Sequence, residues 1–237
     1  MSPTSSSASY RESAEERRLL LRQQEINLQL KCQLALMDKY YWLTQCTETE
    51  DNQDSEHPYK PFPRRAYMKP LLDLLDAEPV VLIEKSRTMM ASWLVAGFCA
   101  HLAFNRSATV VLFQSQDEER AVNLVKYVKC LWKRSLPQLK KHWAVRQDVD
   151  RQAHYEFKLA NGSEFHGVVG DPQKVRSLHP SVYVADEAAW MDQFEDAWAV
   201  AAGTRVPKLI ALSSVAPGAY WSICNEGSKY VNWPGVE

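Results

Sequence analysis

Several features that would point to a function at once are missing from this sequence. The net charge is only −1, which argues against a surface coated with positive charge for nonspecific DNA binding. The five cysteines have neither CxxC spacing nor a zinc-ligand pattern with histidine, so we interpret them as reduced thiols in a reducing compartment. Any contact with nucleic acid therefore has to come from a local patch or from a larger assembly.

Targeting signals and repeats are missing as well. The N-terminus is rich in serine without the apolar segment of a signal peptide, and no apolar run is long enough to cross a bilayer. No internal repeat is present. Hydrophobic residues make up 46% of the 237 positions, so the chain can bury a large core. We expect a soluble, intracellular protein that does not act at a membrane.

The sequence pattern divides the chain into two parts. Residues 1–11 are polar and predict a mobile tail. Residues 47–63 are acidic, contain prolines and lack periodicity, which indicates a linker. We therefore expect a helical subdomain with its linker in residues 1–60 and the main domain in residues 61–237. Between tail and linker, residues 12–46 predict one long helix whose apolar face includes Leu20, Ile26, Leu30, Leu34 and Met37.

Strands and helices alternate from residue 80 onward. Short apolar runs predict strands, with helical patterns between them, and Asn161-Gly162 predicts a hairpin. Apolar runs without alternation, separated by helices, indicate a parallel sheet buried on both faces, so the fold class is α/β. The tryptophans on helical stretches are expected to pack in the core or between elements: Trp132, Trp143, Trp190 and Trp198. The predicted strands of the parallel sheet are 80–84, 109–113, 182–185 and 208–212.

The sharpest motif is the pair Asp186-Glu187 at the end of the apolar strand 182–185. In Mg²⁺-dependent nucleotide hydrolysis, one carboxylate holds the metal and a second polarises the attacking water. A parallel strand delivers such residues to the carboxyl edge of its sheet, where ligands bind in these folds. The alternative is a strand followed by an acidic helix N-terminus, since Asp and Glu also favour that position.

A second motif follows the strand at 80–84. An eight-residue loop leads into a helix there, the arrangement in which backbone N–H groups and a helix N-terminus hold phosphate. Ser92 lies where a hydroxyl ligand for Mg²⁺ belongs. The usual GxxxxGK(S/T) pattern is broken, because the loop lacks glycine and has Ala91 at the lysine position. A basic turn without a ligand is the alternative. The loop residues are Lys85, Ser86, Arg87, Thr88, Met89, Met90, Ala91 and Ser92.

In their order and spacing these motifs resemble the large terminase subunits of tailed bacteriophages, in which a lysine or arginine can open a deviant Walker A loop. The resemblance covers residues 61–230. It implies a P-loop fold of the ASCE or RecA-like kind, with a parallel-sheet core flanked by helices and an N-terminal helical subdomain. The further segments that match in family order are 65–68, 113–116, 161–163, Arg176 and 212–218.

The resemblance implies roles around the phosphates. Asp186 and Ser92 would hold Mg²⁺, and Glu187 would activate water. Lys85 would neutralise the β- and γ-phosphates, with a lysine that faces solvent as the alternative. Arg87 would contact the γ-phosphate of its own chain, or brace the loop.

Other implied roles lie further away. Arg65 and Met68 would lie on the adenine side, although the family often has glutamine where Met68 stands. Arg176 would act as an arginine finger on a neighbouring copy, or be a loop arginine with a local partner. Ser213 and Ser214 would couple the nucleotide state to movement of a neighbouring subdomain, or simply cap a turn.

The implied function is ATP hydrolysis with Mg²⁺, coupled to translocation of double-stranded viral DNA into a procapsid. The implied partners are the portal protein, the small terminase subunit and further copies in a ring. The implied location is the host cytoplasm, at the procapsid portal and not in the mature virion. Terminases normally carry a C-terminal nuclease domain, and we expect none in these residues. The alternatives are a helicase-like DNA translocase and a nucleotide-binding structural protein that does not hydrolyse.

Overall fold

A computed structural model describes residues 5–226 except positions 52, 87–88, 170 and 215, with side chains from residue 15 to 225. Its central sheet has six strands in the order β3-β8-β7-β4-β6-β5. β5 pairs with β6 in antiparallel orientation, and the other neighbouring pairs are parallel. The expected parallel sheet and the expected hairpin are both confirmed. The strands are β3 (Val80–Glu84), β4 (Val110–Ser115), β5 (Glu156–Lys158), β6 (Glu164–Val169), β7 (Val182–Asp186) and β8 (Lys208–Ser213).

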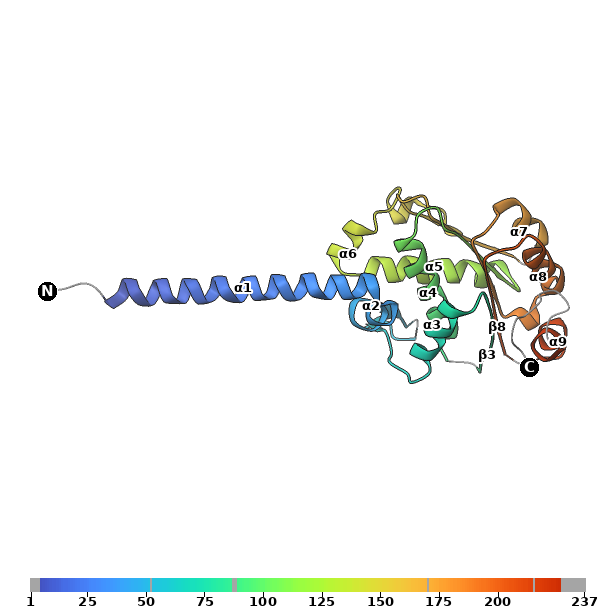
Figure 1. Ribbon diagram of the computed structural model, residues 1–237, viewed down its shortest axis with the longest axis horizontal. Coiled ribbons are helices and arrows are strands. Elements are labelled where there is room, and N and C mark those ends of the chain that lie inside the picture. Colours follow the sequence, from blue (N-terminus) through green and yellow to red (C-terminus); the bar gives the residue numbers. More distant parts are fainter. Residues whose placement is uncertain (1–4, 52, 87–88, 170, 215, 227–237) are drawn as a thin grey trace.

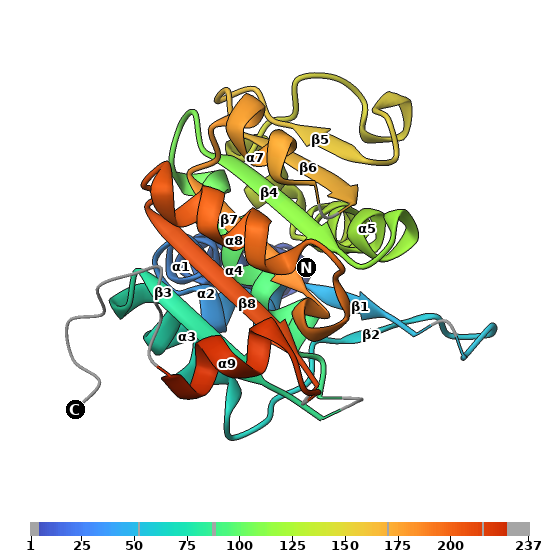
Figure 2. The same ribbon diagram turned by 90° about the vertical axis from the view of Figure 1, so that its right-hand side faces the viewer.

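Helices cover both faces of this sheet (Figure 2). In β7, Val182 and Val184 belong to one apolar cluster, and Tyr183 and Ala185 belong to another. Because both faces are buried, the strand sequences show no alternation between apolar and polar residues. The first face is covered by α3 (Met68–Ala77), α4 (Ala91–Asn105) and α5 (Glu118–Arg134), and the second by α7 (Pro172–Leu178), α8 (Phe194–Gly203) and α9 (Ala219–Glu226). Shorter helices in the connections are α6 (Pro137–His142), η1 (Val149–Arg151) and η2 (Ala188–Trp190).

The single long helix predicted before residue 47 is wrong, because the structure has two helices, α1 (Ser5–Met37) and α2 (Lys39–Cys46). Asp38 separates them with an extended backbone (φ −122°), and its carboxylate accepts the N–H of Tyr41 at 3.0 Å. This is an N-cap, which favours the start of a new helix. Because α1 already begins at Ser5, the expected mobile tail is also corrected from that residue onward.

The apolar face predicted on the first helix does not pack against the domain. Its residues Leu20, Ile26, Leu30, Leu34 and Met37 are between 42% and 83% exposed. Figure 1 shows the reason: most of α1 extends away from the body of the molecule. Only its last turns contact the domain, through the opposite face, which carries Cys32, Ala35 and Leu36.

The predicted linker is instead a hairpin of β1 (Glu48–Glu50) and β2 (Tyr59–Pro61), paired in antiparallel orientation. Its acidic residues have a local partner, since Lys60 forms ion pairs with Asp51 at 2.6 Å and Asp54 at 3.3 Å. Strands of three residues are too short for a periodic pattern.

The segment before the hairpin shares the main hydrophobic core. Trp42 of α2 is fully buried, with its ring 5.4 Å from that of Trp143 and 5.7 Å from that of Phe104. Its indole N–H donates to Ser135 Oγ at 3.0 Å. α2 is therefore fixed to the helices that cover the sheet.

His101 of α4 predicts a pH-dependent stability. Burial lowers the pKa of its imidazole below 6.5, Lys39 acts in the same direction, and the Ala35 carbonyl, Asp38 and Asp76 act against it. The neutral ring therefore stabilises the fold above pH 6.5, and this contribution is lost as the pH falls below that value, by up to about 1.4 kcal/mol per pH unit.

Chemical unfolding of wild type and His101→Gln across this range checks the prediction. Glutamine cannot titrate and can still donate to the Ala35 carbonyl, which the His101 Nε2 contacts at 3.0 Å. We expect the free energy of unfolding of the variant to change less with pH, and parallel curves would contradict this role for His101.

Candidate active site

The phosphate-binding loop predicted from the sequence begins at Lys85, directly after β3. The backbone N–H of Lys85 donates to the Ser213 carbonyl at 2.9 Å, which extends the pairing of β3 with β8. At the other end, Met90 precedes α4 in a left-handed conformation (φ 55°) that glycine adopts at lower cost. A methionine thus adopts a conformation that the missing glycine would favour. Arg87 and Thr88 lie outside the described residues.

Lys85 meets the predicted carboxylate pair. Its Nζ lies 2.8 Å from Glu187 Oε1 and 3.6 Å from Asp186 Oδ1. Burial raises the pKa of the Asp186 carboxyl, while the Lys85 cation and a hydrogen bond with the Ser92 side chain act to lower it. The structure therefore brings Lys85, Ser92, Asp186 and Glu187 together from two distant segments.

Glu187 follows β7 in a left-handed conformation (φ 55°, ψ 41°). Its backbone N–H donates to Asp186 Oδ1 at 3.0 Å, and the chain then enters η2. A left-handed backbone is unfavourable for a residue with a side chain and persists only where the surroundings impose it. Unfavourable backbone conformations thus occur on both sides of the site, at Met90 and at Glu187.

The predicted coupling serines hold the turn that follows Glu187. Ser213, at the buried end of β8, accepts the N–H of Ala189 through its Oγ at 3.1 Å. Ser214 Oγ accepts the indole N–H of Trp190 at the same distance, 3.1 Å. These two hydrogen bonds connect the end of β8 to η2, and a coupling role for the serines stays a prediction.

A pocket of about 470 Å³ opens beside the Lys85–Glu187 ion pair. Gln116, Arg120 and Trp190 line it. The resemblance matched the segment 113–116 without giving Gln116 a role, and the sequence did not point to Arg120. Trp190 is 53% exposed and its indole N–H donates to Ser214, so it packs between elements and not in the core, whereas Trp143 and Trp198 are buried in the core. The remaining lining residues are Lys85, Ser86, Glu187 and Ser214.

The predicted adenine-side residues lie at the start of α3. Met68 is fully buried in the main core, and its role on the adenine side stays a prediction. Arg65 is exposed, and its carbonyl accepts the Met68 N–H at 3.0 Å. Between them, the Tyr67 hydroxyl donates to the Met89 carbonyl, which ties this segment to the phosphate-binding loop.

Arg176 lies in the last turn of α7, exposed to solvent. It lines a different pocket of about 530 Å³, together with Asp196 and other residues of α7 and α8. Since α7 leads from the carboxyl end of β6 back to the start of β7, Arg176 lies away from Lys85 and Glu187 of its own chain. Action on a neighbouring copy stays a prediction.

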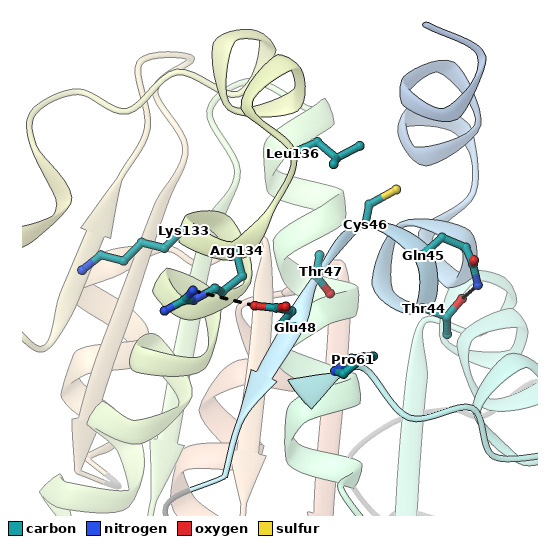
Figure 3. Close-up of a pocket in the computed structure, with 9 residues that line it drawn as sticks. All are labelled: Thr44, Gln45, Cys46, Thr47, Glu48, Pro61, Lys133, Arg134 and Leu136. Atoms are coloured by element: carbon teal, nitrogen blue, oxygen red, sulfur yellow. Dashed lines mark hydrogen bonds and ion pairs between the residues drawn. The ribbon is translucent and has the colours of Figure 1, made fainter. Parts of the chain in front are cut away.

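Another pocket, of about 400 Å³, lies among α2, the hairpin and the end of α5 (Figure 3). The Arg134 guanidinium lies 3.2 Å from the ring centroid of Tyr59 and 3.8 Å from Glu48, so these contacts fasten the hairpin to α5. Burial raises the pKa of the Cys46 thiol to about 11, which disfavours the thiolate there. All five cysteines are free thiols.

The donors at the Lys85 site suit Mg²⁺ and a nucleotide. Mg²⁺ prefers hard oxygen ligands, and the Asp186 carboxylate and Ser92 hydroxyl are adjacent oxygens of that kind. Within the described part of the chain, no three His, Cys, Asp or Glu side chains gather as a metal site. A Mg²⁺ ion held by Asp186 and Ser92 would therefore take its other ligands from water and the nucleotide.

The topology defines the class of fold. β8 lies between β3, which leads into the loop, and β7, which carries the carboxylates. The six-stranded, mostly parallel sheet with helices on both faces is an α/β fold, as predicted from the sequence.

Comparison with models of protein families and with the sequences of curated proteins finds no match. Among solved structures, the chain is similar to the large terminase ATPase domain of Thermus phage P74-26. An arginine-to-alanine variant of that domain has 14% identity and a TM-score of 0.49, over 68% of this chain and 70% of that one. A second structure of the domain has 13% identity and a TM-score of 0.46, over 68% of each chain.

Large terminases are the family that the motif order resembles. At this level of identity and overlap the likeness carries no argument about activity, which has to come from the residues of the site. Of the described helices, none is both long and apolar enough to cross a membrane.

Proposed function

We propose that this chain is the ATP-hydrolysing motor domain of a viral large terminase subunit, which couples ATP hydrolysis to the movement of double-stranded DNA into a procapsid. One observation carries the proposal. Lys85, from the loop after β3, lies on the Asp186-Glu187 pair at the end of β7, at the edge of the sheet where ligands bind in such folds.

Each residue of the site has a separate role in the proposed hydrolysis. Water attacks the terminal phosphorus, the bond to the oxygen that leaves with ADP breaks, and Glu187 orients the water and accepts its proton. Lys85 stabilises the negative charge on the phosphate oxygens. Asp186 and Ser92 would hold Mg²⁺, which when bound supplies further positive charge to the phosphates.

ATP would have to displace one contact before it could react. Lys85 Nζ is bound to the Glu187 carboxylate, the group that has to be available to water. Phosphate oxygens compete for the same ammonium group, so nucleotide binding would release Glu187. Ser213 and Ser214 bind the turn after Glu187. Movement of Glu187 away from Lys85 would therefore also shift the end of β8, which supports a coupling role.

The partners follow from the proposed class. They are double-stranded DNA, the portal protein, the small terminase subunit and further copies in a ring at the procapsid. The near-neutral charge supports dependence on an assembly, since little in this chain would hold DNA alone.

Phosphate release measured with Mg²⁺, alone and with DNA, tests the proposal. We expect ATP hydrolysis that requires Mg²⁺ and is stimulated by double-stranded DNA. Stimulation by single-stranded DNA alone would favour the helicase-like translocase. Tight ATP binding without release, in the assembled state, would favour the structural protein and contradict hydrolysis.

Lys85→Ala should weaken ATP binding and slow hydrolysis together, by about 10- to 100-fold each, because Lys85 contacts the phosphates before and during the reaction. Lys85→Arg, which keeps the charge, should retain part of both. Binding is measured by calorimetry and turnover by phosphate release, with an unfolding curve of each variant to check that it is folded.

Lys69→Ala is the matched control, since Lys69 forms an exposed ion pair with Asp73 on α3. It should leave affinity and turnover unchanged. If Lys85→Ala behaves like this control, Lys85 is a surface lysine and the site has been assigned wrongly.

A further inference from the structure

The pocket beside Lys85 and Glu187 contains a second cation that sequence reasoning did not select, Arg120. We propose that Arg120 is a catalytic residue that contacts the terminal phosphate of ATP bound by its own chain. The proposal rests on the proposed function and adds Arg120, which the motifs do not select, to Arg87, to which the resemblance gives a contact with the same phosphate. Three observations support it: the position of Arg120 at the edge of the sheet, the packing of the helix that carries it, and the weak ion pair of its side chain.

The sheet brings Arg120 to the catalytic edge. β4 lies beside β7, and Ser115 at the end of β4 is in register with Asp186 at the end of β7. The Ser115 hydroxyl donates to the Asp186 carbonyl at 2.8 Å. The chain that follows Ser115 therefore starts level with the carboxylate pair, and within it Gln116 and Arg120 line the pocket shared with Lys85.

Arg120 lies in the first turn of α5, a helix that packs closely against the sheet. The Asp117 carboxylate caps α5 by accepting the Arg120 N–H at 2.8 Å. The next residue, Ala121, is buried against β6 so closely that a Cβ atom on Gly167 would lie 2.6 Å from its carbonyl oxygen. The backbone that carries Arg120 is therefore fixed, so its side chain can reach a phosphate without the reordering of a loop.

The two cations among the described lining residues are held very differently. The Lys85 side chain is only 12% exposed and bound to both catalytic carboxylates. The Arg120 side chain is 50% exposed, and its Nε lies 3.6 Å from Oδ2 of Asp117, whose side chain is 46% exposed. Exposed ion pairs of this kind contribute little free energy, so the guanidinium can exchange Asp117 for a phosphate.

Arginine suits this position chemically. Its planar guanidinium stays charged and can donate two hydrogen bonds to phosphoryl oxygens, which gain negative charge during transfer. Arg120 would act within its own chain, and Arg176 would act on a neighbour. The two roles are separate.

Affinity for ATP and for ADP in Arg120→Ala is the primary test, because ADP lacks the terminal phosphate. We expect ATP affinity to fall by about tenfold while ADP affinity is kept. Single-turnover phosphate release at saturating ATP, without DNA, should fall by about 10- to 100-fold. Arg120→Lys should recover part of both effects.

Two control variants keep the test specific. Asp117→Asn removes the ion pair with Arg120 but keeps a capping residue, so it should leave single-turnover phosphate release unchanged. Arg146→Ala removes an exposed arginine beside β5 and should do the same.

Equal losses for ATP and ADP, or normal release by Arg120→Ala, would overturn the role of Arg120 while the proposed function stands. A loss confined to DNA-stimulated release would overturn it too and assign Arg120 to DNA. If the wild-type chain binds no ATP, the proposed function fails, and this inference fails with it.

Discussion

Glu187→Gln is expected to abolish ATP hydrolysis and leave nucleotide binding intact. Glutamine cannot accept the proton of the attacking water, and loss of a general base costs about 10²- to 10⁴-fold in rate. The metal position, which depends on Asp186 and Ser92, is unchanged. Because the variant also removes the carboxylate that holds Lys85 at 2.8 Å, ATP should bind at least as tightly as it does to wild type.

Single-turnover phosphate release and calorimetric titration with ATP check both halves of this prediction. Glu25→Gln, an exposed glutamate on α1, is the matched control and should match wild type. Near-normal turnover of Glu187→Gln at saturating ATP would remove Glu187 from the mechanism. Loss of ATP binding would show that the ion pair with Lys85 supports the site and does not compete with the nucleotide.

Arg176→Ala should eliminate hydrolysis in the assembled state, because an arginine finger from a neighbour contributes about 10³- to 10⁵-fold. The position of Arg176 on the exposed face of α7, away from Lys85 of its own chain, is the one such a residue needs. Lys174→Ala, an exposed cation on the same helix, is the control and should remain active.

A mixing experiment separates action on a neighbour from action within one chain. Arg176→Ala and Glu187→Gln proteins should each be inactive alone. Mixed under assembly conditions, some interfaces unite an intact Arg176 with an intact Glu187, and activity should partly return. A mixture that stays inactive although assembly is confirmed, or normal hydrolysis by assembled Arg176→Ala, would exclude the finger.

The central features of the fold could be predicted because short sequence patterns encode them. Apolar runs such as 182–185 predict buried parallel strands, and Asn161-Gly162 predicts the turn between β5 and β6, where Gly162 has a φ of 83°. The meeting of Lys85 with Asp186 and Glu187 followed from the rule that parallel strands present their ends at one edge.

Other features depend on contacts that no local pattern encodes. Arg120 and Gln116 belong to the site only because β4 lies beside β7, and that strand order is not visible in the sequence. The sequence indicates only that both follow the carboxyl end of a predicted strand, the edge where ligands bind in such folds. Trp190 faces the pocket because Glu187 turns the chain with a left-handed backbone, which a glutamate does not predict.

The N-terminal segment was misinterpreted for related reasons. Its helical period was correct, but a period does not tell which face finds a partner, and the face with Leu30 and Met37 finds none in the described chain. Asp38 could have been recognised as a helix cap between two helices, since Asp is a preferred N-cap residue.

The most direct test of the central claim is a crystal structure of the chain with a non-hydrolysable ATP analogue and Mg²⁺. We predict that Lys85 Nζ leaves Glu187 and binds oxygens of the β- and γ-phosphates, with Mg²⁺ on Ser92 and Asp186 and with Glu187 turned to the water that faces the terminal phosphate. An analogue bound elsewhere, with Lys85 still on Glu187, would contradict the assignment of this site to ATP hydrolysis.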